Sequence, residues 1–174
     1  DIAVLSLGDI VASESVRLAG DQLNSDIAEY IKEHHGLIIG EHTAERIKIE
    51  LGTAQKVDDP QTMEVRGRDV ASGMPKQIET NENEIADALH DTLEQIVRAS
   101  VAVLETVPPE LASDIIDRGI MLTGGTAMLH GIDKLFSDRL KVPVVVSQDP
   151  LDNVAKGAGE LLERMQSDSG KNRK

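Results

Sequence analysis

Short apolar runs near both ends of the chain have the pattern of strands. They occupy residues 2–7, 120–122 and 142–146, and glycine or proline lies beside each of them. Runs of this length between such residues are typical of strands. Gly8-Asp9 separates the first run from another alternating run, which predicts a tight hairpin. The sheet is therefore expected to draw its strands from both ends of the chain.

Between these runs, apolar residues recur every three or four positions, which predicts amphipathic helices. Two of the helices should end at Gly36 and Gly52, because glycine is the usual residue just beyond a helix. A long helix should open at Asn81, with Glu84 three residues later in the manner of a capping box. The predicted helices cover about residues 21–36, 41–52, 81–107 and 151–166.

The middle of the chain differs from its two ends in the elements that its sequence pattern predicts. Two strands are predicted there, at 62–69 and 75–80, joined by a turn-rich segment and preceded by two of the helices. This arrangement suggests a small lobe inserted into a larger α/β unit. The polar residues 167–174 read as a tail outside the last helix.

Composition excludes several classes of protein. The 174 residues carry a net charge of −13, which argues against a nucleic-acid binder, because such proteins need Lys and Arg to neutralise phosphates. There is no cysteine, so neither a disulfide framework nor a thiolate zinc site is expected. No apolar run approaches the roughly 18 residues of a membrane span, and no leader pattern opens the chain. With one Phe and one Tyr, the core must be aliphatic.

A pair of glycines stands where a strand turns into a predicted helix. Residues 120–122 are apolar, Thr123-Gly124-Gly125-Thr126 follows, and apolar residues then return at helical spacing. Ligands of open α/β folds bind at such carboxyl ends of strands, where free N–H groups of a helix suit phosphate and glycine allows close approach. The alternative is a tight turn and nothing more. The pattern matches neither a P-loop nor the G-x-G-x-x-G fingerprint, so both readings stay open.

Five segments spaced along the chain carry a resemblance to a known family. They read MEVRGRD, GMPKQIE, VPPELASDIIDRGIMLTGG, HGIDKL and VPVVVSQDPLDNVAKGAGELLE. Together they resemble the rod-shape-determining MreB family, the bacterial actins, from residue 1 to about residue 166. The resemblance covers only the second half of a typical member, and it implies an α/β fold: an actin-like ATPase (ribonuclease H-like) subdomain with an inserted small α+β lobe. The implied division is subdomain IIA at 1–22 and 87–166, subdomain IIB at 23–86, and the polar tail at 167–174.

The resemblance gives the glycine pair a role. Gly124, Gly125 and Thr126, with Ala127, match the loop that lies against the nucleotide in the family. Members usually carry a third glycine where this chain has Thr126, whereas eukaryotic actin has the same Gly-Gly-Thr. A threonine there can still cap a helix.

A second segment resembles the family's adenosine side. Glu45, Arg46, Ile47 and Lys48 match it within GEHTAERIKIELG. Glu45 and Lys48 lie one helical turn apart, so both could reach a ribose or a base edge. The residues alone favour a surface ion pair between Glu45 and Lys48, worth a few tenths of a kcal/mol, over contact with a ligand.

The implied function is that of a cytoskeletal protein. The resemblance implies that the full-length protein binds ATP or ADP with Mg²⁺, assembles into filaments and guides cell-wall synthesis in rod-shaped bacteria. Its implied partners are further copies of itself, RodZ and the wall-elongation machinery, and it would lie in the cytoplasm against the inner face of the membrane through regions outside this chain. Hydrolysis would need groups from the other half, so no catalytic residue or metal ligand is predicted here. The alternatives are the ATPase half of a sugar kinase or Hsp70-type chaperone, and a non-catalytic interaction domain.

The same resemblance predicts a gap in the sheet. In the actin-like fold, a central strand lies between the N-terminal hairpin and the strands at 119–123 and 142–147, and it precedes the segment that begins at Asp1. Without that strand, we expect one of three outcomes: local closure of the sheet, a strand from another chain in the gap, or an unstable fragment.

Overall fold

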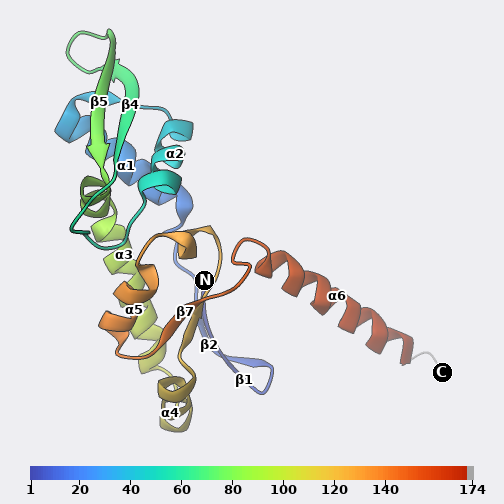
Figure 1. Ribbon diagram of the computed structural model, residues 1–174. Coiled ribbons are helices and arrows are strands. Elements are labelled where there is room, and N and C mark those ends of the chain that lie inside the picture. Colours follow the sequence, from blue (N-terminus) through green and yellow to red (C-terminus); the bar gives the residue numbers. More distant parts are fainter. Residues whose placement is uncertain (172–174) are drawn as a thin grey trace.

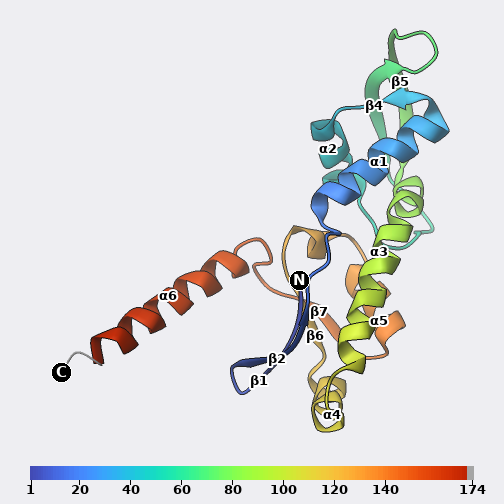
Figure 2. The ribbon, with the colours of Figure 1, turned by 180° about the vertical axis from the view of Figure 1, so that it is seen from behind.

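A 24-residue helix, α3 (Glu82–Glu105), starts in one part of the molecule, continues along the other and so joins the two (Figure 1). The structure is a computed structural model that describes the backbone of residues 1–171 and the side chains of residues 1–163. One part packs against the start of α3 and the other along the rest of it, as the reverse view also shows (Figure 2). The mixed α/β content agrees with the predicted fold class.

The part at the start of α3 contains the predicted strand pair. It comprises α1 (Gly20–His35), β3 (Leu37–Ile38), α2 (Glu41–Leu51), β4 (Thr62–Asp69) and β5 (Pro75–Asn81). The three strands form an antiparallel sheet in the order β3-β4-β5, and α1 and α2 pack together beside it. Both long strands occur where the alternation predicted them, and the two-residue β3 is an addition.

The predicted helix ends are confirmed by their caps. Gly36 ends α1 with a φ of 62°, in the left-handed region that glycine tolerates. The side chain of Asn81 accepts hydrogen bonds from the backbone N–H groups of Asn83 and Glu84 at the start of α3. The Glu84 carboxylate does not return to residue 81 as in a complete capping box, because Thr80 and His35 bind it at 2.6 and 3.1 Å.

The second part of the molecule holds two separate pairs of strands. β1 (Ile2–Ser6) and β2 (Asp9–Glu14) form an antiparallel hairpin, and β6 (Ile120–Leu122) and β7 (Val144–Val146) pair in parallel. The hairpin turn differs by one residue from the prediction: its central residues are Leu7 and Gly8, with φ of 54° and 92°, and Asp9 already belongs to β2.

Three helices complete this part. α4 (Pro109–Arg118) was not predicted, although a proline at the first position is a known helix start. α5 (Ile132–Leu140) packs against α3, and α6 (Asn153–Lys171) projects away from the body in both views (Figures 1 and 2). α6 begins two residues later than predicted and continues past residue 166 into the expected polar tail, where its backbone stays helical to Lys171.

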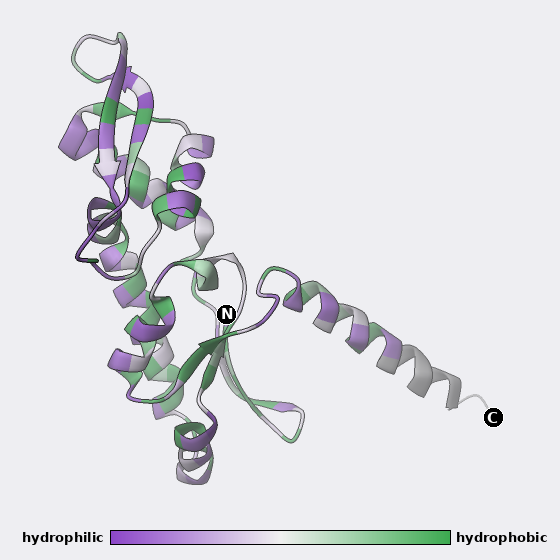
Figure 3. Ribbon diagram, in the orientation of Figure 1, coloured by the Kyte–Doolittle hydropathy of each residue, from purple (hydrophilic) through white to green (hydrophobic). Residues whose placement is uncertain are grey.

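One aliphatic core connects the two parts. Figure 3 shows apolar and polar residues alternating along α3 and α5. The buried cluster runs without interruption from Leu23 and Ile27 of α1 to Phe136 of α5 and Val144 of β7. The predicted limits of the inserted lobe, at 22/23 and 86/87, fall inside α1 and α3, and the division into subdomains IIA and IIB stays a prediction.

The sheet of the second part is open at its centre. Within the described residues, β1 pairs only with β2, and β6 only with β7. A cavity of about 670 Å³ separates β1 from β6 and is lined also by α3 and α4. We call this cavity the slot. The first of the three expected outcomes, local closure of the sheet, is therefore not observed, and β1 and β6 each keep one unpaired edge toward the slot.

Candidate nucleotide-facing site

The glycine pair forms a sharp exit from β6. Gly124 has a φ of 87°, and Gly125 begins a short 3-10 helix, η1 (Gly125–Met128). The predicted direct passage from turn to α-helix is wrong, because Leu129 and His130 leave the helical path and α5 starts only at Ile132. Thr126 therefore lies inside η1 and caps no α-helix.

The outer side of this turn is open. A Cβ on Gly124 would meet nothing within 4 Å, and one on Gly125 would meet only a Leu151 methyl carbon at 3.6 Å. Gly125 is exposed and Thr126 half-buried, whereas Ala127 is buried beneath them. The backbone of the turn can thus be approached closely by a ligand, as the functional reading of the glycines requires.

A residue that sequence reasoning missed holds the turn in place. The Thr123 hydroxyl donates to the carbonyl of Pro150 at 3.1 Å and accepts from Ser147 and Asn153, each at 3.2 Å. The N–H of Gly124 donates to the same Pro150 carbonyl at 2.8 Å. Thr123 therefore ties the ends of β6 and β7 to the start of α6. The sequence does contain a signal for Thr123: it is a hydroxyl-bearing residue between a predicted strand and a pair of glycines.

The predicted adenosine-side residues lie on α2 and differ in accessibility. Glu45 and Arg46 are exposed, whereas Ile47 is fully buried in the core, so its side chain is not available to a ligand. Lys48 is half-buried, and its ammonium donates to the carbonyl of Gly20 at 3.0 Å. The ion pair between Glu45 and Lys48, predicted as the alternative, is not formed. Lys48 instead joins α2 to the first residue of α1.

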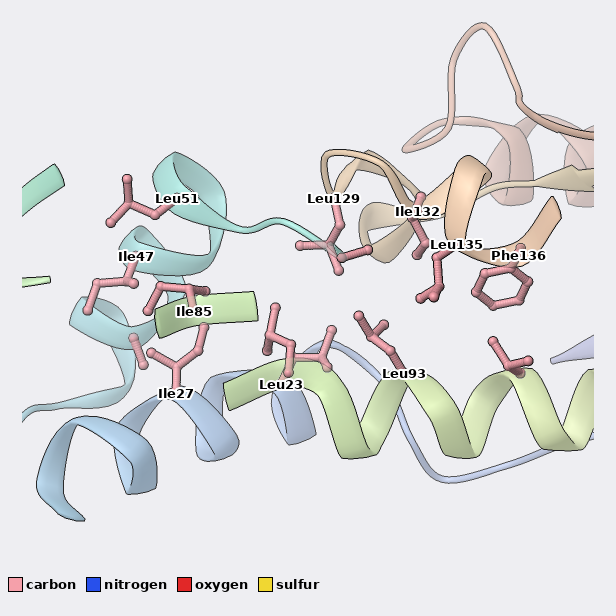
Figure 4. Packing of buried hydrophobic residues seen from close by; sticks show 14 of the residues in the cluster. Leu23, Ile27, Ile47, Leu51, Ile85, Leu93, Leu129, Ile132, Leu135 and Phe136 are labelled. Atoms are coloured by element: carbon pink, nitrogen blue, oxygen red, sulfur yellow. The ribbon is translucent and has the colours of Figure 1, made fainter. Parts of the chain in front are cut away.

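Backbone pairing joins the end of α2 to the end of the glycine turn. Ala54 N–H donates to His130 O at 2.8 Å, and His130 N–H donates to Gly52 O at 3.1 Å. Thr53 and His130 form a parallel bridge, and Figure 4 shows Leu51 at the end of α2 and Leu129 at the end of the glycine turn on the same side of α3. We call this pairing of residues 52–54 with 129–130 the seam. It brings the two predicted site segments into one continuous structure.

Charged groups elsewhere are accounted for by local contacts. Hydrogen bonds from Ser72 and Lys76 lower the pKa of Asp69, in the β4–β5 hairpin, to about 2. Burial, followed by the charges of Glu84 and Asp87, raises the pKa of Tyr30 on α1. Among the described residues, no group of three or more His, Asp or Glu side chains is placed to hold a metal ion. None of the described helices has the length and apolar character needed to cross a membrane.

Comparison with known proteins assigns the family. The sequence profile of the MreB/Mbl protein family matches residues 1–170. The chain belongs to this family. It is 48% identical over 165 residues to the cell shape-determining protein Mbl of Bacillus subtilis, covering 95% of this chain and 50% of that protein. It is 46% identical over 170 residues to the cell shape-determining protein MreB of Escherichia coli, covering 98% of this chain and 49% of the relative. This MreB/Mbl chain thus spans about half the length of the curated relatives it matches.

Solved structures agree with this assignment. MreB 5 of Spiroplasma citri bound to AMPPNP superimposes with a TM-score of 0.93 at 34% identity, covering 98% of this chain and 51% of that one. The double helical filament of MamK superimposes with a TM-score of 0.67 at 19% identity, covering 83% of this chain and 44% of that one, which is a likeness of fold alone. The predicted actin-like ATPase fold is confirmed, and the kinase and chaperone alternative is not favoured.

Proposed function

We propose that this chain is the nucleotide-facing second half of an actin-like cytoskeletal protein that determines cell shape. Both curated relatives are named as cell shape-determining proteins and match nearly the whole chain. The observation that carries the nucleotide-binding part of the proposal is the open, exposed glycine turn at the carboxyl end of β6. Structures of MreB5 of Spiroplasma citri, bound to AMPPNP and to ADP, support the same role.

The residues present fit the adenosine end of a nucleotide. Gly124 and Gly125, with Thr126 and the backbone of Ala127, would lie against the nucleoside, because the space beside Gly124 is open and only a Leu151 methyl carbon lies near the Cβ position of Gly125. On α2, Glu45 and Arg46 are exposed and free of ion pairs within the described structure, and their polar groups suit the ribose hydroxyls or a base edge.

The phosphates and Mg²⁺ are assigned to the other half of the protein. When bound, the metal would neutralise phosphate charge during hydrolysis of ATP. The contribution of this chain is to bind and orient the nucleoside, and Lys48 holds α2 against the carbonyl of Gly20 while it does so. Residues 1–174 alone are therefore expected to bind ATP weakly, since charge-assisted hydrogen bonds to the phosphates would be missing.

Assembly and location are proposed by analogy with the family. We infer that the full-length protein self-associates into filaments, as MamK does in its double helical filament. RodZ, the wall-elongation machinery and the inner face of the membrane are the further partners we propose, with ATP-bound subunits favoured in the filament. Pelleting of the full-length protein with ATP, but not without nucleotide, is the direct test of this function.

Substitution of Gly125 tests the turn itself. In the full-length protein, Gly125→Val should weaken ATP binding at least about tenfold, a loss of about 1.4 kcal/mol, because its methyl groups would occupy the side from which the ligand approaches. Folding should change little, since a Cβ at this position makes an ordinary 3.6 Å contact and Gly125 has no positive φ. Titration calorimetry and the urea midpoint measure the two effects. Unchanged ATP affinity would leave the glycines with a turn-forming role alone.

A further inference from the structure

We propose that the seam positions the two nucleotide-facing segments relative to each other, with Gly52 and Thr53 as its positioning residues. The inference rests on the proposed nucleotide site and concerns how its two sides are coupled. Gly52 and Thr53 are not expected to touch the ligand, because Thr53 is 1% exposed and Gly52 is covered by Leu129.

The connections through the seam are too short to flex independently. Lys48 lies one helical turn before Gly52, and its carbonyl accepts the Gly52 N–H at 3.0 Å. On the other strand of the seam, Ala127 is followed almost at once by Leu129, whose N–H donates back to Thr126 at 3.2 Å. A displacement of α2 is therefore transmitted through a few rigid peptide units to the glycine turn.

Gly52 has no room for a side chain. A Cβ there would lie 2.1 Å from the carbonyl oxygen of Lys48 and 2.6 Å from a methyl carbon of Leu129. Both distances are far below van der Waals contact. Because the Lys48 carbonyl belongs to the last turn of α2, a side chain at residue 52 would displace residue 52, and the seam with it, from the end of α2. The φ of Gly52 is −64°, so the need for glycine is one of space rather than of backbone conformation.

Thr53 locks the same junction by hydrogen bonds. Its buried hydroxyl donates to the carbonyl of Gln55 at 2.8 Å and lies 3.3 Å from the carbonyl of His130. Removing the buried hydroxyl while keeping the shape, as in Thr53→Val, leaves these two carbonyl acceptors with one donor fewer. This change loosens the seam without the steric pressure of Gly52→Ala.

The two ends of α2 provide a matched pair of variants. Gly40 caps the start of α2 with a φ of −87°, and a Cβ there would meet nothing within 4 Å. Gly40→Ala is thus the control for Gly52→Ala: the same substitution, on the same helix, at the end that lacks the seam.

The test measures hydrogen exchange of residues 41–51 and 123–130 in the full-length protein, with and without ADP. In the parent and in Gly40→Ala, ADP should slow exchange in both segments. In Gly52→Ala, ADP affinity should fall about tenfold or more, and the remaining protection should be confined to residues 123–130. If Gly52 and Thr53 only stabilise the fold, their variants should have a lower urea midpoint, and ADP should still protect both segments.

The outcomes separate this inference from the proposed function. Absence of ADP binding by the parent contradicts the proposed function and, with it, the inference. If the parent binds ADP, ADP should no longer slow hydrogen exchange of α2 in Thr53→Val. This second variant tests the inference even if Gly52→Ala does not fold. Parent-like affinity with both segments protected in Thr53→Val overturns the positioning role.

Discussion

Restoring the strand that fits the slot should raise the stability of residues 1–174 markedly. We expect that about twenty residues of the natural upstream sequence, enough for one strand and a loop, will raise the urea midpoint by about 1 M or more. The gain comes from pairing the free edges of β1 and β6 and from filling the 670 Å³ slot with apolar side chains. Burial of two or three such side chains contributes about 1.5–3 kcal/mol each, and urea slopes of about 1–3 kcal/mol per molar convert this into the midpoint shift.

The control for this experiment is an extension of equal length that cannot pair. A Gly/Ser-rich segment adds the same number of residues without apolar side chains, so the midpoint should stay where it is. Sedimentation of residues 1–174 without any extension distinguishes the remaining outcomes, because a strand borrowed from another chain would make the oligomer dominate. A strictly monomeric fragment as stable as its extended form would mean that the slot is not the place of a missing strand.

Elements with strong local signals could be predicted from the sequence. Asn81 and Gly36 supplied caps whose hydrogen bonds and φ are observed, and the alternation over 62–69 set the bounds of β4. These features depend on residues within one turn or one strand, so a single sequence contains the whole cause.

The features that were missed depend on contacts between distant segments. η1 replaces the expected start of a helix because His130 pairs with Gly52 and Ala54, more than seventy residues away in sequence. Ile47 was assigned to the site only because it matches the family's adenosine-side segment, yet its side chain belongs to the core shared by α1 and α2. The proposed site residues came from the family resemblance, and the proposed coupling between them rests on backbone hydrogen bonds that only the structure shows.

The junction between α4 and β6 should tolerate a single added methyl group poorly, because both backbone conformation and space oppose it. Gly119 has a φ of 77°, and a Cβ there would lie 2.4 Å from the carbonyl oxygen of Pro143. That carbonyl accepts the N–H of Ile120 at 2.8 Å, the first hydrogen bond that joins β6 to the chain leading into β7. Relief of the clash would therefore break the register of the parallel pair.

Gly119→Ala should accordingly cost more than backbone strain alone. Gly131 is the matched control for Gly119. Its φ is 70° and a Cβ there would meet nothing within 4 Å, so alanine would cause backbone strain but no clash. We expect Gly131→Ala to lower the free energy of unfolding by about 1–2 kcal/mol, the cost of a left-handed alanine. Gly119→Ala should lower it by about 3 kcal/mol or more, since overpacking against backbone adds about 1–3 kcal/mol. Urea unfolding of both variants in the full-length protein measures the difference. Equal losses would show that β6 and β7 can separate at Pro143 without cost, and that their pairing does not hold the glycine turn at the carboxyl end of β6.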